Sequence, residues 1–190
     1  MPVKLAGFAG GDRTDIALPK IQRDLLEELR ATGVPLVVVL TSGSALAVGD
    51  VHQYAAAMLH AWYPGEEGGT AIAETLAGDN NPAGRLPLTF YSFVDQLPPF
   101  EDYSMANRTY RYFRGKPLYG FGYGLSYSRF GYSNLRLPSQ SVRAGDAVTV
   151  AVDVENLSQR AGDEVVELYL TQPRSALTPP RCNRASGCCF

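Results

Sequence analysis

Pairs of carboxylates are the side chains of this sequence that offer the most direct route to chemistry. The acids that lie next to or near one another are Asp12 and Asp15, Glu66 and Glu67, and Glu101 and Asp102, with Asp79 as a further candidate. Retaining hydrolysis of a glycosidic bond requires two carboxyls about 5–5.5 Å apart, one ionised and one protonated. Glu66 and Glu67 are adjacent at a predicted helix start, so their side chains diverge and their charge offsets the helix dipole. Glu101 and Asp102 have no evident partner, and no pair predicts catalysis by itself.

Asp12 stands in a glycine-rich context, after Gly10 and Gly11 and before Arg13. The simpler interpretation is that the two charged side chains pair with each other or cap a turn. Contact with a ligand is the alternative, and the residues alone leave both open.

Nucleophilic catalysis and metal binding have weaker support. Ser42 and Ser44 follow a predicted strand, but the G-x-S-x-G pattern of a nucleophile elbow is absent. His52 and His60 belong to no recognisable triad pattern, which favours structural roles. Their spacing also matches no single helix face. The two histidines therefore make no metal-binding motif with Glu66 and Glu67.

Two further motifs do not predict a cofactor site. The phrase GFGYG at 120–124 lacks the third glycine, the preceding strand and the following helix of a phosphate-binding loop, and is better interpreted as a turn among aromatic residues. The three cysteines, Cys182, Cys188 and Cys189, have the wrong spacing for zinc, and no histidine follows His60. We therefore predict no metal and no organic cofactor.

Composition excludes several classes of protein. The 190 residues have a formal net charge of -2 and are 45% hydrophobic and 19% charged, which is typical of a globular protein. Balanced charge gives no reason to expect nucleic acid or an anionic membrane as a partner. No apolar run reaches the roughly 18 residues that span a bilayer, and the first 15 residues contain no apolar core of a secretory signal.

The first half of the chain alternates between predicted helices and strands. Apolar residues at helical spacing follow Pro19, and Gly33 ends that helix. The pattern then predicts a buried strand at 36–40, a helix around 51–57, another short buried strand at 58–63, a helix at 66–77 and a strand at 86–90. This alternation favours an α/β fold with a mostly parallel sheet and flanking helices.

The second half has a different pattern. Residues 91–127 are rich in tyrosine, phenylalanine and glycine, and we expect them to pack over a domain surface. Alternating valines at 148–154 and the apolar run at 165–170 then predict strands of an antiparallel β-sandwich with one buried face. A sandwich of the immunoglobulin or fibronectin kind takes about seven strands in about 100 residues, so this one is predicted to be incomplete and to expose apolar edges.

Several long phrases resemble the C-terminal portion of glycoside hydrolase family 3, and most closely its β-xylosidase and β-glucosidase branch. They are GGDRTDIALP at 10–19, AWYPGEEGGTAIAETLAGDNNPAGRLPLTF at 61–90, NRTYRYFRGKPLYGFGYGLSYSRFGYSNL at 107–135 and RAGDEVVELYL at 160–170. They occur in the family's order over about residues 5–181. This combination is far more specific than any single motif.

The resemblance implies a fold and an activity. Members of the family have a (β/α)8 barrel with an aspartate nucleophile, then an α/β sandwich that supplies an acid/base glutamate, then a fibronectin type III-like domain. They release sugars from β-linked glucosides, xylosides or arabinosides with retention and without a cofactor. Expected partners are therefore a β-glycoside or oligosaccharide substrate and the barrel, with neither nucleic acid nor a membrane.

The family's catalytic carboxylates have no counterpart among these residues. No barrel precedes Met1, and the residues before the GGDR phrase, where the family has its acid/base residue, contain no glutamate. Glu101 and Asp102 match the family's linker instead. We expect an inactive fragment with no catalytic residue, in which Asp12 and Arg13 lie nearest the substrate.

The resemblance also sets the expected domains. They are a partial α/β sandwich at 1–92, an aromatic linker at 93–128, a truncated fibronectin type III-like domain at 129–181 and an aberrant tail at 182–190. A non-catalytic accessory module that binds carbohydrate or protein is the alternative function, and a truncated or misannotated gene is a third interpretation. Localisation stays unknown, although members of the family are often periplasmic or secreted.

Overall fold

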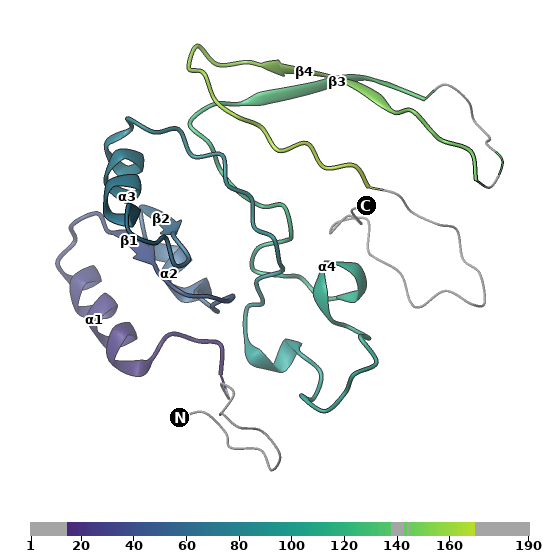
Figure 1. The fold of residues 1–190 in the computed structure, drawn as a ribbon. Coiled ribbons are helices and arrows are strands. Elements are labelled where there is room, and N and C mark those ends of the chain that lie inside the picture. The colour runs from purple at the N-terminus through teal and green to yellow at the C-terminus, as the bar shows by residue number, and fades with distance from the viewer. Residues whose placement is uncertain (1–14, 138–142, 144, 170–190) are drawn as a thin grey trace. The chain divides into compact units, whose positions relative to one another are not determined.

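The structure, a computed structural model, describes residues 15–137, 143 and 145–169 (Figure 1). Asp12, Arg13 and the tail at 182–190 lie outside the described residues. The chain forms two compact units. The first contains the described parts of 1–72, 86–123 and 167–190, and the second contains residues 73–85 and 124–166.

The first unit begins with helix α1 (Lys20–Ala31). The carbonyl of Pro19 accepts hydrogen bonds from the amides of Gln22 and Arg23, which starts the helix. Its end is confirmed at Gly33, whose φ of 72° is the left-handed conformation that glycine adopts most easily. The apolar positions at helical spacing, Ile21, Leu25 and Leu29, are nevertheless exposed to solvent.

Two parallel strands form the sheet of the first unit. Strand β1 (Val37–Leu40) pairs with β2 (Ala57–His60), and the register runs from Val37 opposite Ala57 to Leu40 opposite His60. Helix α2 (Gly49–Tyr54) connects them, and α3 (Gly68–Ala77) follows β2 and ends in the second unit. This strand–helix–strand order confirms the predicted α/β class for this part of the chain.

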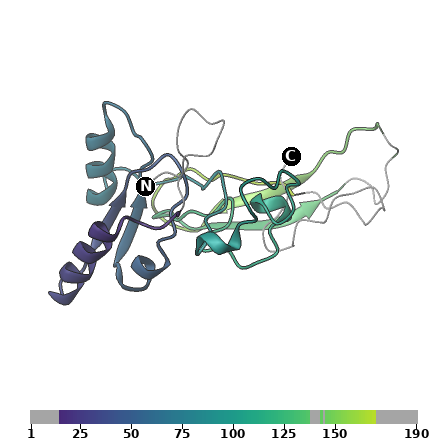
Figure 2. The same cartoon turned by 90° about the horizontal axis from the view of Figure 1, so that it is seen from below.

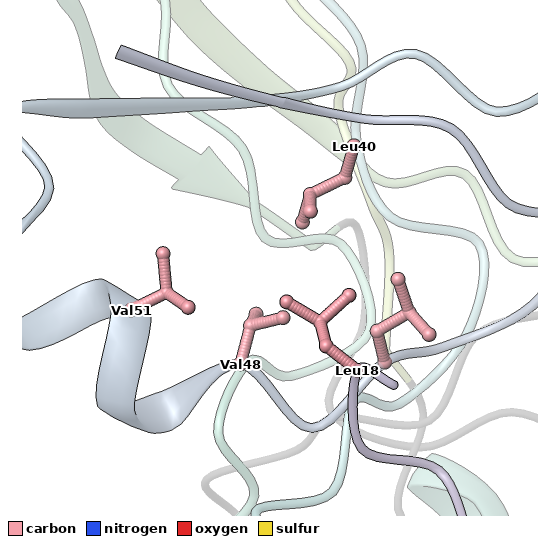
Figure 3. Close-up of a cluster of buried hydrophobic side chains, with 5 residues drawn as sticks. Leu18, Leu40, Val48 and Val51 are labelled. Atoms are coloured by element: carbon pink, nitrogen blue, oxygen red, sulfur yellow. The ribbon is translucent and has the colours of Figure 1, made fainter. Parts of the chain in front are cut away.

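A cluster of aliphatic side chains forms the core of the first unit, and Figure 3 shows them converging. Its buried members are Leu18, Leu40, Leu46, Val48 and Val51. The backbone of Ala47 donates to the carbonyl of Ile16 at 2.8 Å, which holds the segment before α1 beside the segment before α2. Leu40, the last residue of β1, thus shares one core with residues of these two segments and of α2.

Two predicted strands are wrong. Residues 86–90 form only an isolated bridge between Phe90 and Tyr119. Pro87 has no amide hydrogen to donate, and the amides of Leu86 and Phe90 bond to the carbonyls of Tyr123 and Tyr119 instead. Residues 165–168 also form no strand in the described part of the chain, and of this segment only Tyr169 takes part in a bridge.

The aromatic stretch contains little regular structure. It has one 3₁₀ turn, η1 (Val94–Gln96), and one helical turn, α4 (Thr109–Tyr112). Extended segments joined by turns make up the remainder of residues 91–127.

The second unit is built on an antiparallel hairpin, whose two strands lie side by side in both views (Figures 1 and 2). Strand β3 (Phe130–Arg136) pairs with β4 (Ala151–Asn156), from Phe130 opposite Asn156 to Arg136 opposite Ala151. The register shifts between Ser133 and Arg136, where Asn134 has a φ of 53°. Asparagine tolerates this conformation, so the shift is a local bulge.

Candidate functional site

The carboxylate pairs do not converge. Glu66 and Glu67 are both exposed just before α3, and an oxygen of Glu67 accepts a hydrogen bond from the Thr70 hydroxyl at 3.1 Å. This is a local contact at a helix start and not an acid–nucleophile arrangement. The predicted substrate-proximal residues Asp12 and Arg13 lie outside the described residues.

Asp102 stabilises a turn. Its Oδ1 accepts a hydrogen bond from the Ser104 amide at 2.8 Å, and the guanidinium of Arg108 donates to the Asp102 carbonyl at 2.9 Å. Hydrogen bonds from Ser104 hold the pKa of the Asp102 carboxyl below its ordinary value, and the charge of Arg108 acts in the same direction. A general acid needs its pKa raised, so this shift is in the opposite direction.

His60 and Ser42 form a hydrogen-bonded pair at the ends of the two parallel strands. The Ser42 hydroxyl donates to the carbonyl of Ser44 at 2.7 Å and lies 3.0 Å from Nε2 of His60. Since the hydroxyl has one hydrogen, Nε2–H of the histidine must be the donor in the second bond. Nδ1 of His60 is buried and has no hydrogen-bond partner among the described residues, whereas a catalytic triad places a carboxylate there.

Aromatic rings surround this histidine. The ring of His60 lies 4.2 Å from that of Trp62 and 5.3 Å from that of Phe90, measured between centroids. Burial among them lowers the pKa of His60, because the imidazolium loses its hydration there. Phe90 in turn contacts Tyr119, which stacks on Tyr123 at 4.8 Å.

The strand predicted at 58–63 ends early, and this changes the position of two aromatic residues. The backbone pairing of β2 with β1 stops at His60, and Trp62 has a φ of 55°, which is incompatible with a continuing strand. Tyr63 is therefore exposed and not buried as predicted. The sequence feature that could have indicated this early end is the position of Trp62 and Tyr63 directly before the turn residues Pro64 and Gly65.

The glycine-rich phrase at 120–124 is a turn, as predicted. Gly122 has a φ of 76°, and its amide donates to the carbonyl of Leu86 at 2.8 Å. Phe121 stacks on Tyr110 at 4.3 Å. In the same stretch Tyr91 contacts Phe113 edge-on at 4.9 Å, so many of these ring faces are occupied by one another.

Asn81 organises the second unit. Its amide nitrogen donates to the Ser128 hydroxyl at 2.9 Å and to the carbonyl of Ala161 at 2.8 Å. Its oxygen accepts from the Ser126 hydroxyl at 3.0 Å and from the Tyr127 amide at 2.9 Å. One side chain thus uses two donors and two acceptor positions to join three segments that are distant in sequence.

Arg85 and Glu164 join the same segments through charge. Nη2 of Arg85 lies 2.6 Å from Oε2 of Glu164, and the other carboxylate oxygen accepts from the Tyr132 hydroxyl at 2.7 Å. Arg85 also donates to the carbonyl of Ala83 at 3.1 Å. The phrases at 61–90, 107–135 and 160–170 therefore supply partners to one structural network.

Metal-binding and membrane-spanning features are absent from the described part of the chain. No group of three or more His, Cys, Asp or Glu side chains there is arranged to hold a metal ion. No helix among the described residues has the length and apolar character needed to cross a bilayer.

Comparison with known proteins relates the chain to one family. The family model described as the glycosyl hydrolase family 3 C-terminal domain matches residues 4–127. A xylan 1,4-beta-xylosidase of Xylanibacter ruminicola is 46% identical over 90% of the chain, and a periplasmic beta-glucosidase of Salmonella typhimurium is 41% identical over 88% of it. The matches cover 19% and 24% of those two relatives, so the chain spans about a fifth to a quarter of their length.

Solved structures that match the chain also have glycosidase names. A beta-glucosidase from Erythrobacter marinus matches 84% of the chain with a TM-score of 0.69 and 39% identity, over 21% of its own length. A beta-D-glucoside glucohydrolase from Trichoderma reesei matches 94% of the chain with a TM-score of 0.77 and 28% identity, over 29% of its own length.

Proposed function

The chain belongs to glycosyl hydrolase family 3, and we propose that it is part of a β-glycosidase that hydrolyses β-xylosides or β-glucosides in carbohydrate breakdown. The observation that supports this most strongly is the 46% identity to a xylan 1,4-beta-xylosidase over nearly the whole chain. We infer the substrate class from the activities for which such relatives are named.

We infer that the two catalytic carboxylates come from residues outside this sequence. Retaining hydrolysis needs a nucleophile and an acid on opposite sides of one glycosidic bond. The described acids considered as candidates lie at exposed positions or take part in local contacts, as Asp102 does with Ser104. The role proposed for this chain is to complete the α/β part of the enzyme beside a (β/α)8 barrel, with no metal or organic cofactor.

The finer organisation is also a proposal. Residues 1–92 would be the α/β sandwich part, 93–128 an aromatic linker and 129–181 part of a fibronectin type III-like domain. The hairpin of β3 and β4 supports the last of these, because antiparallel pairs of this kind build β-sandwiches.

A chimeric enzyme tests the function. The matching segment of the Xylanibacter ruminicola xylosidase is replaced by this chain, and hydrolysis of nitrophenyl β-xyloside and nitrophenyl β-glucoside is measured. We expect turnover by the chimera and none by the 190-residue chain alone or by the relative with its segment deleted. Turnover by the chain alone that a carboxylate substitution within it abolishes would contradict the assignment of catalysis to other residues.

A further inference from the structure

Strands β1 and β2 are parallel, so the segments that follow them leave the sheet at one edge. Leu40 and His60 are opposite each other at the last position of the register. Residues 41–44 and 61–63 therefore emerge side by side. In α/β sheets this carboxyl edge is where ligands bind.

Tyr63 is the most exposed aromatic side chain at this edge, with 77% of its surface accessible. Its ring lies against the backbone of Gly43, where an added Cβ atom would be 2.7 Å from Cε2 of the tyrosine. A side chain at position 43 would thus displace the ring. The glycine permits this close approach at one edge of the ring and leaves much of the ring in solvent.

Trp62 accounts for the outward direction of its neighbour. Its own ring is held by His60 and by Phe90, at centroid distances of 4.2 and 6.3 Å. Its φ of 55° is rare for a residue with a bulky side chain, and such strained positions are concentrated at functional sites. The strained residue ends the strand and turns the chain so that Tyr63 is presented to solvent.

Charge at this edge selects against anionic ligands. Residues 31–84 contain no lysine and no arginine, while Glu66 and Glu67 follow Tyr63 closely and are exposed. A phosphate, a sulfate or a uronic acid would meet the negative charge of these two glutamates, and residues 31–84 themselves supply no cation to offset it. A neutral ligand avoids this cost.

We propose that Tyr63 is a stacking platform for a neutral pyranose ring of a β-1,4-linked oligosaccharide. The proposal rests on the function proposed above, because that function supplies the ligand class. A pyranose presents a face of C–H groups that packs on the electron-rich face of an aromatic ring, and the phenolic hydroxyl remains available to solvent or to a sugar hydroxyl. Gly43 serves as a positioning residue, because its missing side chain leaves room for the edge of the Tyr63 ring.

The sole tryptophan of the chain provides a local reporter, since Trp62 is adjacent to Tyr63. Tryptophan fluorescence of the 190-residue chain is titrated with xylotetraose, with cellotetraose and with the anionic tetragalacturonate. We expect a saturable change with one or both neutral sugars and none with tetragalacturonate. The neutral sugar that binds more tightly indicates whether the preferred substrate is a β-xyloside or a β-glucoside.

Four variants separate stacking from general stability. Tyr63→Ala is expected to weaken association by about tenfold, and Tyr63→Phe to preserve it, because the ring remains. Gly43→Ala is expected to weaken binding with the tyrosine intact. The matched control is Tyr103→Ala, since Tyr103 is 78% exposed elsewhere in the same unit and should leave binding unchanged. Circular dichroism confirms that each variant is folded.

Several outcomes would overturn the proposal. These are an unchanged affinity in Tyr63→Ala, an equal loss in Tyr103→Ala, or no saturable binding by a folded wild-type chain. The titration reads binding and not hydrolysis, so an inactive chimera would count against the proposed function alone. An active chimera combined with unaffected binding in Tyr63→Ala would reject the stacking platform alone.

Discussion

Arg85 and Glu164 form a largely buried ion pair across 79 residues of sequence, with 2.6 Å between Nη2 and Oε2. Their side chains are 12% and 15% exposed, whereas those of Lys20 and Asp24, which pair at the same 2.6 Å, are 80% and 56% exposed. The two pairs therefore differ in burial and not in length. Burial should decide which of them matters for stability.

Glu164→Gln is expected to lower the free energy of unfolding by about 2–3 kcal/mol, because it leaves the guanidinium of Arg85 buried without a counter-charge. Asp24→Asn, the matched control, should cost less than about 0.5 kcal/mol, since solvent already screens the Lys20–Asp24 pair. Urea denaturation followed by far-ultraviolet circular dichroism measures both. Equal costs would show that burial of the first pair is unimportant.

Asn81→Leu is expected to lower the free energy of unfolding by about 2–4 kcal/mol, because a side chain of similar size then leaves the groups around it without their partners. Asn80→Leu is the control, since Asn80 donates one side-chain bond, to the Thr75 hydroxyl at 3.0 Å, and should cost about 1 kcal/mol or less. Hydrogen exchange of the β3 and β4 amides locates the effect. If these amides were equally protected in both variants, Asn81 would not organise the second unit.

The sequence pattern predicts local structure where one principle dominates. The β-branched run before Leu40 predicts β1, and Gly33 predicts the end of α1, because strand preference and left-handed backbone are properties of single residues. The strand predicted at 86–90 fails for a different reason. Its apolar residues suit a strand, but its pairing with a segment about 30 residues away is made only at its two ends, through Leu86 and Phe90, and no continuous ladder forms.

The site is less predictable for the same reason. The Asn81 contacts with Ser128 and Ala161 span 47 and 80 residues, and no periodicity encodes such separations. The exposure of Tyr63 depends on the conformation of Trp62, which an apolar run does not reveal. The resemblance to a family identifies the relevant phrases, but their contacts come from the fold.

Leu135→Lys is expected to reduce self-association of the chain. The described hairpin exposes apolar residues on both strands, including Leu135 and Val154, and exposed apolar strands favour edge-to-edge pairing. A lysine on a strand opposes this pairing by charge. Leu125→Lys is the control, because Leu125 is also exposed in the second unit but lies outside the strands.

Size-exclusion chromatography with light scattering over a range of protein concentrations measures the effect. A larger fraction of monomer in Leu135→Lys than in Leu125→Lys is the expected result. An equal change in both variants would attribute association to general surface hydrophobicity and not to the hairpin.

His60 is expected to make the stability of the chain depend on pH. Burial lowers its folded pKa below the ordinary 6.5, so the unfolded state binds the proton more readily. The stabilising effect of the neutral imidazole is therefore complete above about pH 6.5 and is lost as the pH falls through 6.5 toward the folded pKa. The urea midpoint should be lower at about pH 5.5 than at about pH 7.5, a range in which ordinary carboxyls stay ionised.

Substitution of each histidine in turn isolates this effect, because the chain has two. His60→Phe places an apolar ring beside Trp62 and Phe90 and should remove most of the dependence on pH, whatever its effect on the midpoint itself. His52→Gln should retain the dependence, since the proton uptake that drives it occurs at His60. A His60→Phe variant whose midpoint still fell by the wild-type amount would show that another group is responsible.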